Sequence, residues 1–440
     1  MSSHELLLQR IGSKEATVGI IGLGYVGLPL ADALHSGGLR VVGFDVDTEK
    51  IEKLARGESY LKHLGPAMTE GLAASERFEA TDDFDRLAEV DAVLVCVPTP
   101  LGPHQEPDLS YVVDSARKIA RAARPGQLVV LESTTYPGTT REVFLSSLRG
   151  EGPDPERELF VAFSPEREDP GSKSHVTSTI PKLVGGIDEP STKLAACLYR
   201  TGFKEVVEVS SAEVAEAAKI LENVFRAVNI ALVNELKLIL SAMDIDVWEV
   251  IEAAASKPFG FMKFLPGPGL GGHYIPIDPF YLAWRARECG QPTRFIELAG
   301  EINSRMPGHV VDRVGEALNG DGKALKDAHV LVLGLAYKAD VDDCRESPAA
   351  EILEILEERG AAVSYHDPHV LRFPRMRRHQ SSLESCDLTA AALEGSDCVV
   401  IVTDHEAIDW RMVGRHAALI VDTRNVMAAL DGVSARVLKA

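Results

Sequence analysis

Cysteine is scarce in this chain. The 440 residues include six cysteines, and no two of them form a Cys-x-x-Cys pair. The sequence therefore suggests neither a zinc knuckle nor a disulfide framework, and a reduced cytoplasmic setting is the simplest interpretation. No apolar run approaches the ~18 residues that a membrane-spanning helix needs, and residues 1–14 lack the basic-then-apolar order of a signal peptide. We expect a cytoplasmic protein with no membrane partner and no metal.

Basic residues are outnumbered by acidic ones. Lys and Arg total 46, Asp and Glu total 66, and the net charge is −20. Because such a surface repels phosphate backbones, we expect no sequence-independent nucleic-acid binding. An anionic substrate would need a pocket in which local cations and backbone N–H groups overcome this field. The composition, 45% hydrophobic and 25% charged, is that of an ordinary globular protein.

The apolar runs divide the chain into three segments. The first alternates short strand-like runs (17–23, 40–44, 90–97, 127–131) with amphipathic stretches such as 25–36, which predicts a parallel sheet covered by helices. Residues 212–243 lack Gly and Pro and repeat apolar residues at helical spacing, which predicts one long helix. Further helices are expected at 247–255 and 294–305, around a Gly/Pro-rich loop at 257–279. The third segment resumes the alternation, with strands at 328–333, 362–365, 398–402 and 418–421 and a helix at 348–359.

A Gly-x-Gly-x-x-Gly motif lies between the first predicted strand and helix, at Gly22, Gly24 and Gly27. Such glycines allow a tight turn, close approach of a pyrophosphate and close helix–strand packing. The second strand ends at Asp45, about 18 residues further on, where an acid accepts hydrogen bonds from ribose hydroxyls. The combination predicts a dinucleotide site that favours NAD over NADP. The alternative is a glycine turn with a purely structural role.

Polar residues follow two further strand candidates. Thr99 comes after one strand, and Glu132 and Thr134 come after the next. At the carboxyl ends of parallel strands such side chains point into the ligand crevice. Ser, Thr and Pro are also ordinary turn residues, so position alone leaves both interpretations open.

Lys219 and Asn223 lie four residues apart on the predicted long helix and so share a face. A lysine in an apolar stripe needs a function or a partner, unless it snorkels at a surface edge.

The stretch 267–279 is the most unusual of the sequence. Its glycines suggest backbone close to a ligand, although an irregular connection is the alternative. The turn at 334–338 could place Lys338 against a phosphate. Arg345 either binds an anion or pairs with Asp342 or Asp343.

Taken together, these stretches resemble the UDP-glucose/GDP-mannose dehydrogenase superfamily of UDP-sugar 6-dehydrogenases, from Gly19 to about Asn425. The resemblance is closest to the UDP-N-acetylglucosamine/hexosamine branch. The strings that carry this closer match are 57–60 (GESY), 97–101 (VPTPL), 106–110 (EPDLS), 164–171 (SPEREDPG) and 257–262 (KPFGFM).

The resemblance implies a fold, a reaction and partners. The fold is α/β, with two Rossmann-like domains joined by a central all-α domain with one long helix. The N-terminal domain (1–205) would bind NAD, the central domain (206–310) would carry the dimerisation helix and the active-site loop, and the C-terminal domain (311–440) would bind the UDP-sugar. The usual enzyme is a homodimer that oxidises the sugar C6 alcohol to a carboxylate with two NAD.

The resemblance also assigns residues. Lys219 and Asn223 would stabilise an alkoxide at C6, Glu166 would handle water, and Asp278 would order water or the lysine. The implied catalytic set is Thr134, Glu166, Lys219, Asn223, Tyr274 and Asp278. The implied NAD contacts are Gly22, Gly24, Tyr25, Val26, Gly27, Asp45, Lys50, Thr99 and Glu132. The implied substrate contacts are Arg167, Phe261, Gly271, Lys338 and Arg345.

One position departs from the family. Tyr274 stands where the family has a cysteine that adds to the C6 aldehyde and carries the second oxidation through a thioester. Three interpretations follow. Tyr274 ends the reaction after one hydride, with Lys219 lowering the pKa of the phenol so that it acts as a base. Alternatively, Glu166 or Asp278 activates water, and a hydrated aldehyde is oxidised slowly. In the third interpretation, the protein binds NAD and UDP-sugar as a regulatory subunit without chemistry.

Overall fold

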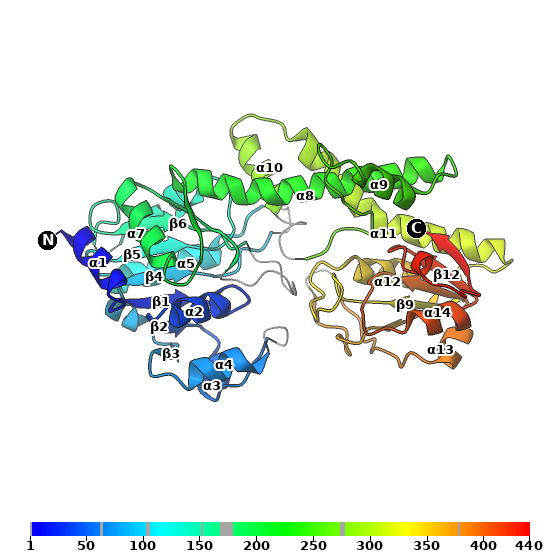
Figure 1. The fold of residues 1–440 in the computed structure, drawn as a ribbon, viewed down its shortest axis with the longest axis horizontal. Helices are drawn as coiled ribbons and strands as arrows, with labels where there is room; N and C mark the ends of the chain where they lie inside the picture. Colours follow the sequence, from blue (N-terminus) through cyan, green and yellow to red (C-terminus); the bar gives the residue numbers. More distant parts are fainter. Residues whose placement is uncertain are drawn as a thin grey trace. The chain divides into compact units, whose positions relative to one another are not determined.

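The computed structural model describes residues 2–61, 65–102, 106–150, 153–167, 179–272, 278–376 and 379–440 (Figure 1). These residues separate by packing into two compact units. The first comprises Met1–Glu222 and Phe280–Gln291, and the second comprises Asn223–Pro279 and Pro292–Ala440. The predicted fold class, α/β with sheet domains at both ends and a long helix between them in sequence, is confirmed.

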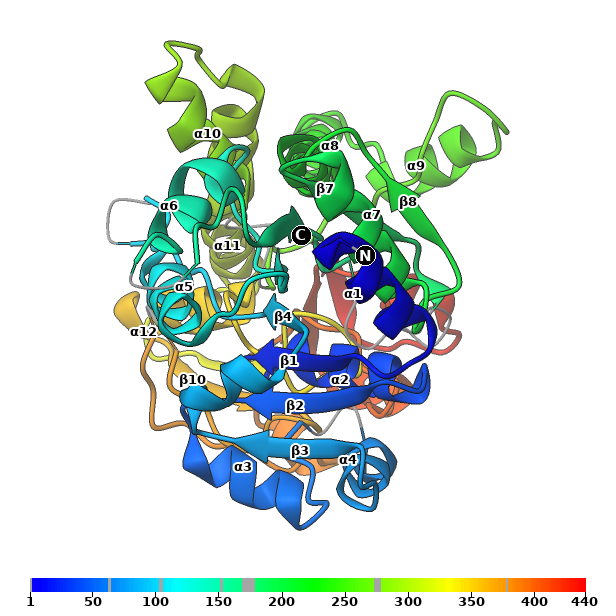
Figure 2. The same cartoon turned by 90° about the vertical axis from the view of Figure 1, so that its left-hand side faces the viewer.

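The first unit is built on a sheet whose described strands follow the order β3-β2-β1-β4-β5-β6-β7-β8. Neighbouring strands pair in parallel, except β6 and β7, which are antiparallel. Figure 2 shows β1, β2 and β3 side by side. The strands are β1 (Thr17–Ile21), β2 (Arg40–Phe44), β3 (Phe78–Thr81), β4 (Ala92–Val95), β5 (Leu128–Leu131), β6 (Phe160–Phe163), β7 (Lys182–Gly186) and β8 (Val206–Glu208).

Helices flank this sheet. Because successive strand residues point to opposite faces, Ile20 packs in the same apolar cluster as Leu28, whereas Ile21 packs in a second cluster with Val112. The helices of this unit are α1 (Ser3–Gly12), α2 (Gly27–Ser36), α3 (Thr48–Ala55), α4 (Pro66–Ala73), η2 (Phe84–Glu89), α5 (Ser110–Ala122), η3 (Thr140–Phe144), α6 (Leu145–Ser147), α7 (Glu189–Tyr199) and α10 (Asp278–Glu288), of which Asp278 and Pro279 belong to the second unit.

The second unit contains a parallel sheet whose described strands follow the order β10-β9-β11-β12-β13. Its strands are β9 (His329–Leu333), β10 (Ala362–His366), β11 (Cys398–Ile401), β12 (Leu419–Asp422) and β13 (Arg436–Lys439). Its helices are α9 (Val247–Ala255), α11 (Arg294–Gly320), α12 (Pro348–Glu358), α13 (Ala390–Glu394), α14 (Trp410–His416) and η5 (Met427–Ala429). Apolar clusters fill both faces of the sheet.

Two long helices define the middle of the chain. The predicted long helix is observed as α8 (Ala212–Ser241), which begins in the first unit and continues in the second. The helix predicted at 294–305 is longer in the structure, where α11 continues through Pro307 to Gly320. The apolar side chains that follow the proline, such as Val310 and Val314, are buried in the core of the second unit, and this packing outweighs the hydrogen bond that Pro307 cannot donate.

The domain boundary expected at residues 310/311 therefore falls inside α11. The three-domain division stays a prediction beside the two packing units. Within the described part of the chain, no helix is both long enough and apolar enough to cross a membrane.

Candidate active site

The N-terminal glycine turn joins β1 to α2. Gly22 has a φ of 92° and donates its N–H to the carbonyl of Phe44 at 2.8 Å. A Cβ on Gly22 would lie 2.7 Å from the carbonyl oxygen of Cys96, and one on Gly27 would lie 1.8 Å from that of Gly22. Both positions therefore require glycine. A Cβ on Gly24 would meet nothing within 4 Å, so this side of the turn has room for a pyrophosphate.

Asp45 follows β2 directly and lies against this turn. Its Oδ2 accepts the N–H of Leu23 at 2.9 Å and lies 3.3 Å from Nζ of Lys50, while its Oδ1 accepts the N–H of Asp47 at 3.0 Å. The structure thus places Lys50 beside Asp45 at the edge where ribose hydroxyls bind in such sheets. Tyr25 and Val26 are half-buried at the start of α2.

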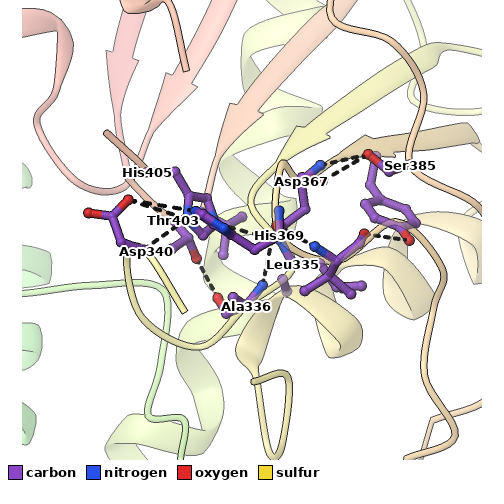
Figure 3. Close-up of polar contacts among 12 residues, drawn as sticks. Leu335, Ala336, Asp340, Asp367, His369, Ser385, Thr403 and His405 are labelled. Atoms are coloured by element: carbon purple, nitrogen blue, oxygen red, sulfur yellow. Dashed lines mark hydrogen bonds and ion pairs between the residues drawn. The ribbon is translucent and has the colours of Figure 1, made fainter. Parts of the chain in front are cut away.

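The second unit contains a similar glycine turn, but the acid beside it has different hydrogen-bond partners. Gly334 has a φ of 90° and donates to the carbonyl of His366, as Gly22 does to Phe44. Asp367 is the counterpart of Asp45, but it is completely buried. Its carboxylate accepts the N–H groups of Leu335, Ala336, His369 and Val370 at 2.7–3.0 Å and contacts Nε2 of His405 at 3.1 Å (Figure 3). These donors leave the carboxylate no position for a ribose.

Asp340, His369 and His405 lie close together beside this second turn (Figure 3). The carboxylate of Asp340 is 3.8 Å from Nε2 of His369 and 4.0 Å from Nδ1 of His405. However, Nδ1 of His405 already accepts the N–H of Asp340 at 3.0 Å, and its Nε2 faces Asp367. His405 therefore offers no free lone pair to a metal ion, and Asp340 and His369 alone are too few ligands.

The predicted strand-end residues meet at the carboxyl ends of β4 and β5. The hydroxyl of Thr99 donates to the carbonyl of Thr134 at 2.7 Å. The hydroxyl of Ser133 donates to the carbonyl of Val97 at the same distance. Thr134 is 6% exposed. The structure thus brings Thr99 and Thr134 together on the sheet edge that also carries the first glycine turn.

Glu132 forms a buried polar network that the sequence did not reveal. One carboxylate oxygen lies 2.6 Å from Nζ of Lys182, and the other accepts the hydroxyl of Tyr199. Burial raises the pKa of Glu132, and Lys182 opposes this shift. Lys182 also donates to the carbonyl of Pro165, directly before Glu166. A side-chain contact between Glu132 and NAD would have to replace one of these bonds.

Glu166 is buried at the edge of a cavity of about 20 Å³, whose other lining residues include Val26, Arg167 and Lys182. The cavity is large enough for one water molecule. Arg167 forms an ion pair with Glu222 at 2.6 Å and donates to the carbonyl of Pro181 at 2.9 Å.

The long helix carries Lys219 and Asn223 as predicted. Lys219 is 4% exposed, which excludes a lysine that snorkels to the surface. Asn223 is also buried, and its amide donates to Oδ2 of Asp278 at 2.5 Å. Asn223 and Asp278, two members of the implied catalytic set, are therefore in direct contact.

The glycine-rich loop is fixed on the second unit up to Gly272. The N–H of Gly272 donates to the carbonyl of Arg345 at 3.0 Å, and Gly271 packs against Tyr337. The guanidinium of Arg345 pairs with both oxygens of Asp343, at 2.9 and 2.7 Å. Lys338 is half-buried in the same turn, and Phe261 is 42% exposed. Tyr274 lies outside the described residues, as do residues 168–171 of the resemblance.

A glycine turn with an adjacent acid, polar strand ends and a second nucleotide-type sheet together define a dinucleotide-dependent dehydrogenase with two mononucleotide-binding folds. Three sequence models agree, and the chain belongs to the UDP-glucose/GDP-mannose dehydrogenase family. The NAD binding domain matches residues 16–202, the central domain residues 213–305 and the UDP binding domain residues 331–429. The chain is thus an NAD-dependent dehydrogenase, as predicted.

Its relatives include the UDP-N-acetyl-D-mannosamine dehydrogenase of Pyrococcus horikoshii, which is 36% identical over 93% of this chain and 96% of the relative. An NDP-N-acetyl-D-galactosaminuronic acid dehydrogenase of Ralstonia nicotianae is 33% identical over 94% and 96%. The structure of the Pyrococcus enzyme superposes with a TM-score of 0.83 at 32% identity, over 96% of this chain and 98% of that chain. The predicted amino-sugar branch is confirmed.

Proposed function

We propose that the protein oxidises the C6 alcohol of a UDP-linked N-acetylhexosamine and transfers one hydride to NAD. The observation that carries this proposal is the N-terminal glycine turn with Asp45 beside it, in a chain similar over nine-tenths of its length to dehydrogenases of nucleotide-linked N-acetyl sugars. When bound, NAD supplies the hydride acceptor. The alcohol loses a hydride and a proton, and the products are an aldehyde, NADH and H⁺.

The role proposed for Lys219 and Asn223 is to stabilise negative charge on the C6 oxygen. Both side chains are buried on α8, where their interactions with an alkoxide are stronger than in water. Asp278 accepts a hydrogen bond from the Asn223 amide, which orients the amide. Glu166 borders the small cavity and is proposed to bind water there.

Tyr274 supports a single oxidation. In the family that this chain resembles, a cysteine thiolate adds to the aldehyde and permits the second hydride transfer. A phenol is a far poorer covalent catalyst for this step, so we infer that the reaction ends at the aldehyde. The same substitution favours the second candidate function, a regulatory subunit that binds NAD and UDP-sugar without turnover.

The relatives guide the choice of sugar. The sequence resemblance favours UDP-N-acetylglucosamine, which stays a prediction, whereas several relatives are named for UDP-N-acetyl-D-mannosamine. We therefore propose an N-acetylhexosamine and place UDP-N-acetylmannosamine first among the substrates to test.

A substrate panel tests the proposal. NADH formation would be followed at 340 nm with UDP-N-acetylmannosamine, UDP-N-acetylglucosamine, UDP-N-acetylgalactosamine and UDP-glucose, for the wild-type enzyme and for Lys219→Met. We expect an N-acetylated sugar to be preferred and kcat to fall by at least ~10²-fold in the variant, as for loss of one charge-stabilising group. Binding of NAD and UDP-sugar without NADH from any substrate would support the regulatory subunit instead.

We also propose a homodimer formed through α8. Leu221, Phe225, Leu232, Leu236 and Ile239 are each 36–65% exposed. Their spacing of three, four and seven residues places them along one face of the helix. A continuous exposed apolar stripe of this length is typical of an interface.

A further inference from the structure

We propose that His405 is a positioning residue for the segment 334–347 after β9: its Nδ1 atom holds this segment in place, and it does so only while the imidazole is neutral. The segment carries Lys338 and Arg345, two of the implied substrate contacts. Their role toward a UDP-sugar rests on the proposed function. All of the residues involved belong to the second unit.

The segment 334–347 contains neither helix nor strand. It begins after β9 ends at Leu333, and it ends where α12 begins at Pro348. Asp340, near its middle, has a φ of 60°, in the left-handed region that is uncommon for residues other than glycine. Because no ladder of regular hydrogen bonds fixes this backbone, its conformation depends on contacts from neighbouring parts of the fold.

The residues that follow β11 supply these contacts, because β9 and β11 are neighbouring parallel strands that end at the same edge of the sheet. Nδ1 of His405 accepts the N–H of Asp340 at 3.0 Å, and the N–H of Glu406 donates to Oδ1 of Asp340 at 2.9 Å. The hydroxyl of Thr403 donates to the carbonyl of Ala336 at 2.6 Å (Figure 3). The segment is therefore held at two points, one of which is Asp340.

His405 is itself fixed in the fold. Its side chain is completely buried, and its ring centroid lies 4.9 Å from that of His369. Its carbonyl accepts the indole N–H of Trp410 at 3.2 Å, and its Nε2 lies 3.1 Å from Oδ2 of Asp367. The imidazole therefore presents Nδ1 to Asp340 in a fixed direction.

The contacts assign the proton of the imidazole. A backbone N–H can only donate, so Nδ1, which accepts the N–H of Asp340, carries no proton. Burial opposes the charge of Asp367, but His405 and backbone donors outweigh this effect and lower the pKa of Asp367 to about 2. The ionised carboxylate accepts the proton of Nε2. A second proton on His405 would have to bind at Nδ1, where it would displace the N–H of Asp340.

Three titratable side chains face His405 within the described part of the chain, namely Asp340, Asp367 and His369. The thiol of Cys344 acts on Asp367, and because burial raises the pKa of this thiol, it stays neutral. The carboxylate of Asp340 is 4.0 Å from Nδ1 of His405. A protonated Nδ1 would attract this carboxylate and repel the N–H, so the backbone at Asp340 would have to move.

The segment 334–347 in turn supports the glycine-rich loop. The carbonyl of Arg345 accepts the N–H of Gly272 at 3.0 Å. A Cβ on Gly271 would lie 2.6 Å from Cβ of Tyr337, and a Cβ on Gly272 would lie 3.1 Å from its ring. Because the loop packs directly on the segment, a displacement at Asp340 would disturb the substrate contacts and the loop together.

Two amide variants separate the two nitrogens of the imidazole. His405→Asn places an amide oxygen near the position of Nδ1 and so keeps the acceptor for Asp340. His405→Gln places its amide near the position of Nε2, which keeps a donor to Asp367 and loses the acceptor. The same two substitutions at His416, a partly exposed histidine of this unit that pairs with Glu394, are the matched control.

Calorimetry with UDP and with NAD at pH 7.5 compares these variants. A buried N–H that loses its acceptor lowers the fraction of molecules with the segment in place, and the apparent Kd rises in inverse proportion. We expect His405→Gln to weaken UDP binding about tenfold and His405→Asn to stay within about threefold of the wild type. NAD should bind every variant equally, because its predicted site lies in the first unit.

The pH dependence of UDP binding is the second readout. Histidine is the side chain that ordinarily gains a proton between pH 8 and pH 5. From pH 7.5 to 5.5, the wild-type protein should therefore lose UDP affinity relative to His405→Asn, which has no imidazole to protonate at this position. Titration of the UDP phosphates affects both proteins alike and cancels in the comparison.

Two results would overturn the inference. In one, His405→Asn and His405→Gln have the same affinity for UDP, which means that the Nδ1 acceptor has no role. In the other, UDP binding by the wild-type protein and by His405→Asn changes in parallel with pH. Should His405→Gln fail to fold by circular dichroism, the pH comparison decides.

Hydrogen exchange tests the contact without a ligand. Peptides from 334–347 should exchange faster in His405→Gln than in His405→Asn, and equal exchange would contradict the role of Nδ1. A wild-type protein that binds no UDP would contradict the proposed function, whereas hydrogen exchange would still decide the role of His405. The two failures are therefore distinguishable.

Discussion

Lys237 shows at the scale of one residue how a buried charge lowers the stability of the fold around it. Its amine is buried beside another cation, and its pKa in the folded protein is about 7 instead of 10.5. Between these values the unfolded chain binds more protons than the folded one. The free energy of unfolding should therefore rise with pH across this window.

Thermal unfolding of the wild-type protein and Lys237→Met from pH 6 to 10 checks this linkage. Relative to the variant, which has no amine to titrate, the wild-type midpoint should rise as the pH increases from about 7 towards 10. Parallel curves for the two proteins would show that Lys237 keeps an ordinary pKa in the folded state.

Residue patterns predicted some of the site and missed the rest for a physical reason. Gly22, Gly27 and Asp45 obey a local rule, because turn, helix start and strand end are adjacent in the chain or related by a fixed spacing. Lys182 and Lys237 follow no such rule. Their partners, Glu132 and Gly267, are brought to them by tertiary packing, so the sequence gives no signal for them.

At the scale of elements, α8 holds one loop in each of the two units. In the first, Glu216 accepts the N–H groups of Gly138 and Thr140 at 2.6 and 2.8 Å, and the hydroxyl of Thr140 at 2.6 Å. It thereby fixes the turn that follows Thr134. In the second unit, Asn234 and Lys237 hold Gly267.

Glu216→Gln should destabilise the first unit. Because both carboxylate oxygens accept hydrogen bonds from this turn, an amide would direct its NH₂ group at a donor. We expect a loss of about 1–3 kcal/mol in the free energy of unfolding, measured by urea denaturation. Glu213→Gln, one turn earlier on α8 and more exposed, is the matched control and should lose less than about 1 kcal/mol. Equal losses in both variants would contradict this role.

Elements with strong local patterns were predicted well. The strand at 40–44 and the helix at 247–255 were predicted with their observed ends. The strands β6 and β7 were missed, and no hairpin signal in the sequence marks their antiparallel pairing. The end of α11 was missed because tertiary packing outweighs the local effect of Pro307.

At the scale of the whole molecule, the apolar stripe on α8 predicts a dimer. The double variant Leu236→Asp/Ile239→Asp would place two charges within the stripe, where burial against a second copy is costly. Analytical ultracentrifugation should show a wild-type dimer and a monomeric double variant that keeps its helical content. Leu6→Asp/Leu371→Asp, which changes exposed leucines far from α8 in sequence, is the control and should stay dimeric. A wild-type monomer at micromolar concentration would contradict the proposal.

The two nucleotide-type sheets also differ in the hydrogen bonds of the acid beside each glycine turn. Asp45 bonds to its turn through one backbone N–H and has Lys50 beside it, whereas Asp367 is saturated by backbone donors and His405. The carboxylate of Asp45 therefore keeps acceptor capacity that the predicted ribose contact would use, whereas the carboxylate of Asp367 does not. This division agrees with an NAD binding domain at the N-terminal end and a UDP binding domain at the C-terminal end.

The number of NADH molecules formed per UDP-N-acetylhexosamine consumed tests the central claim most directly. With limiting sugar and excess NAD, a two-electron dehydrogenase should form one NADH per sugar. Mass spectrometry should show a product two mass units below the substrate, and a hydrazine reagent should convert this product to a hydrazone, which identifies it as an aldehyde. Tyr274→Cys should move the ratio towards two if the rest of the site is intact. A wild-type ratio of two, with a uronate product, would contradict the single oxidation, and no NADH from any UDP-sugar would contradict the dehydrogenase itself.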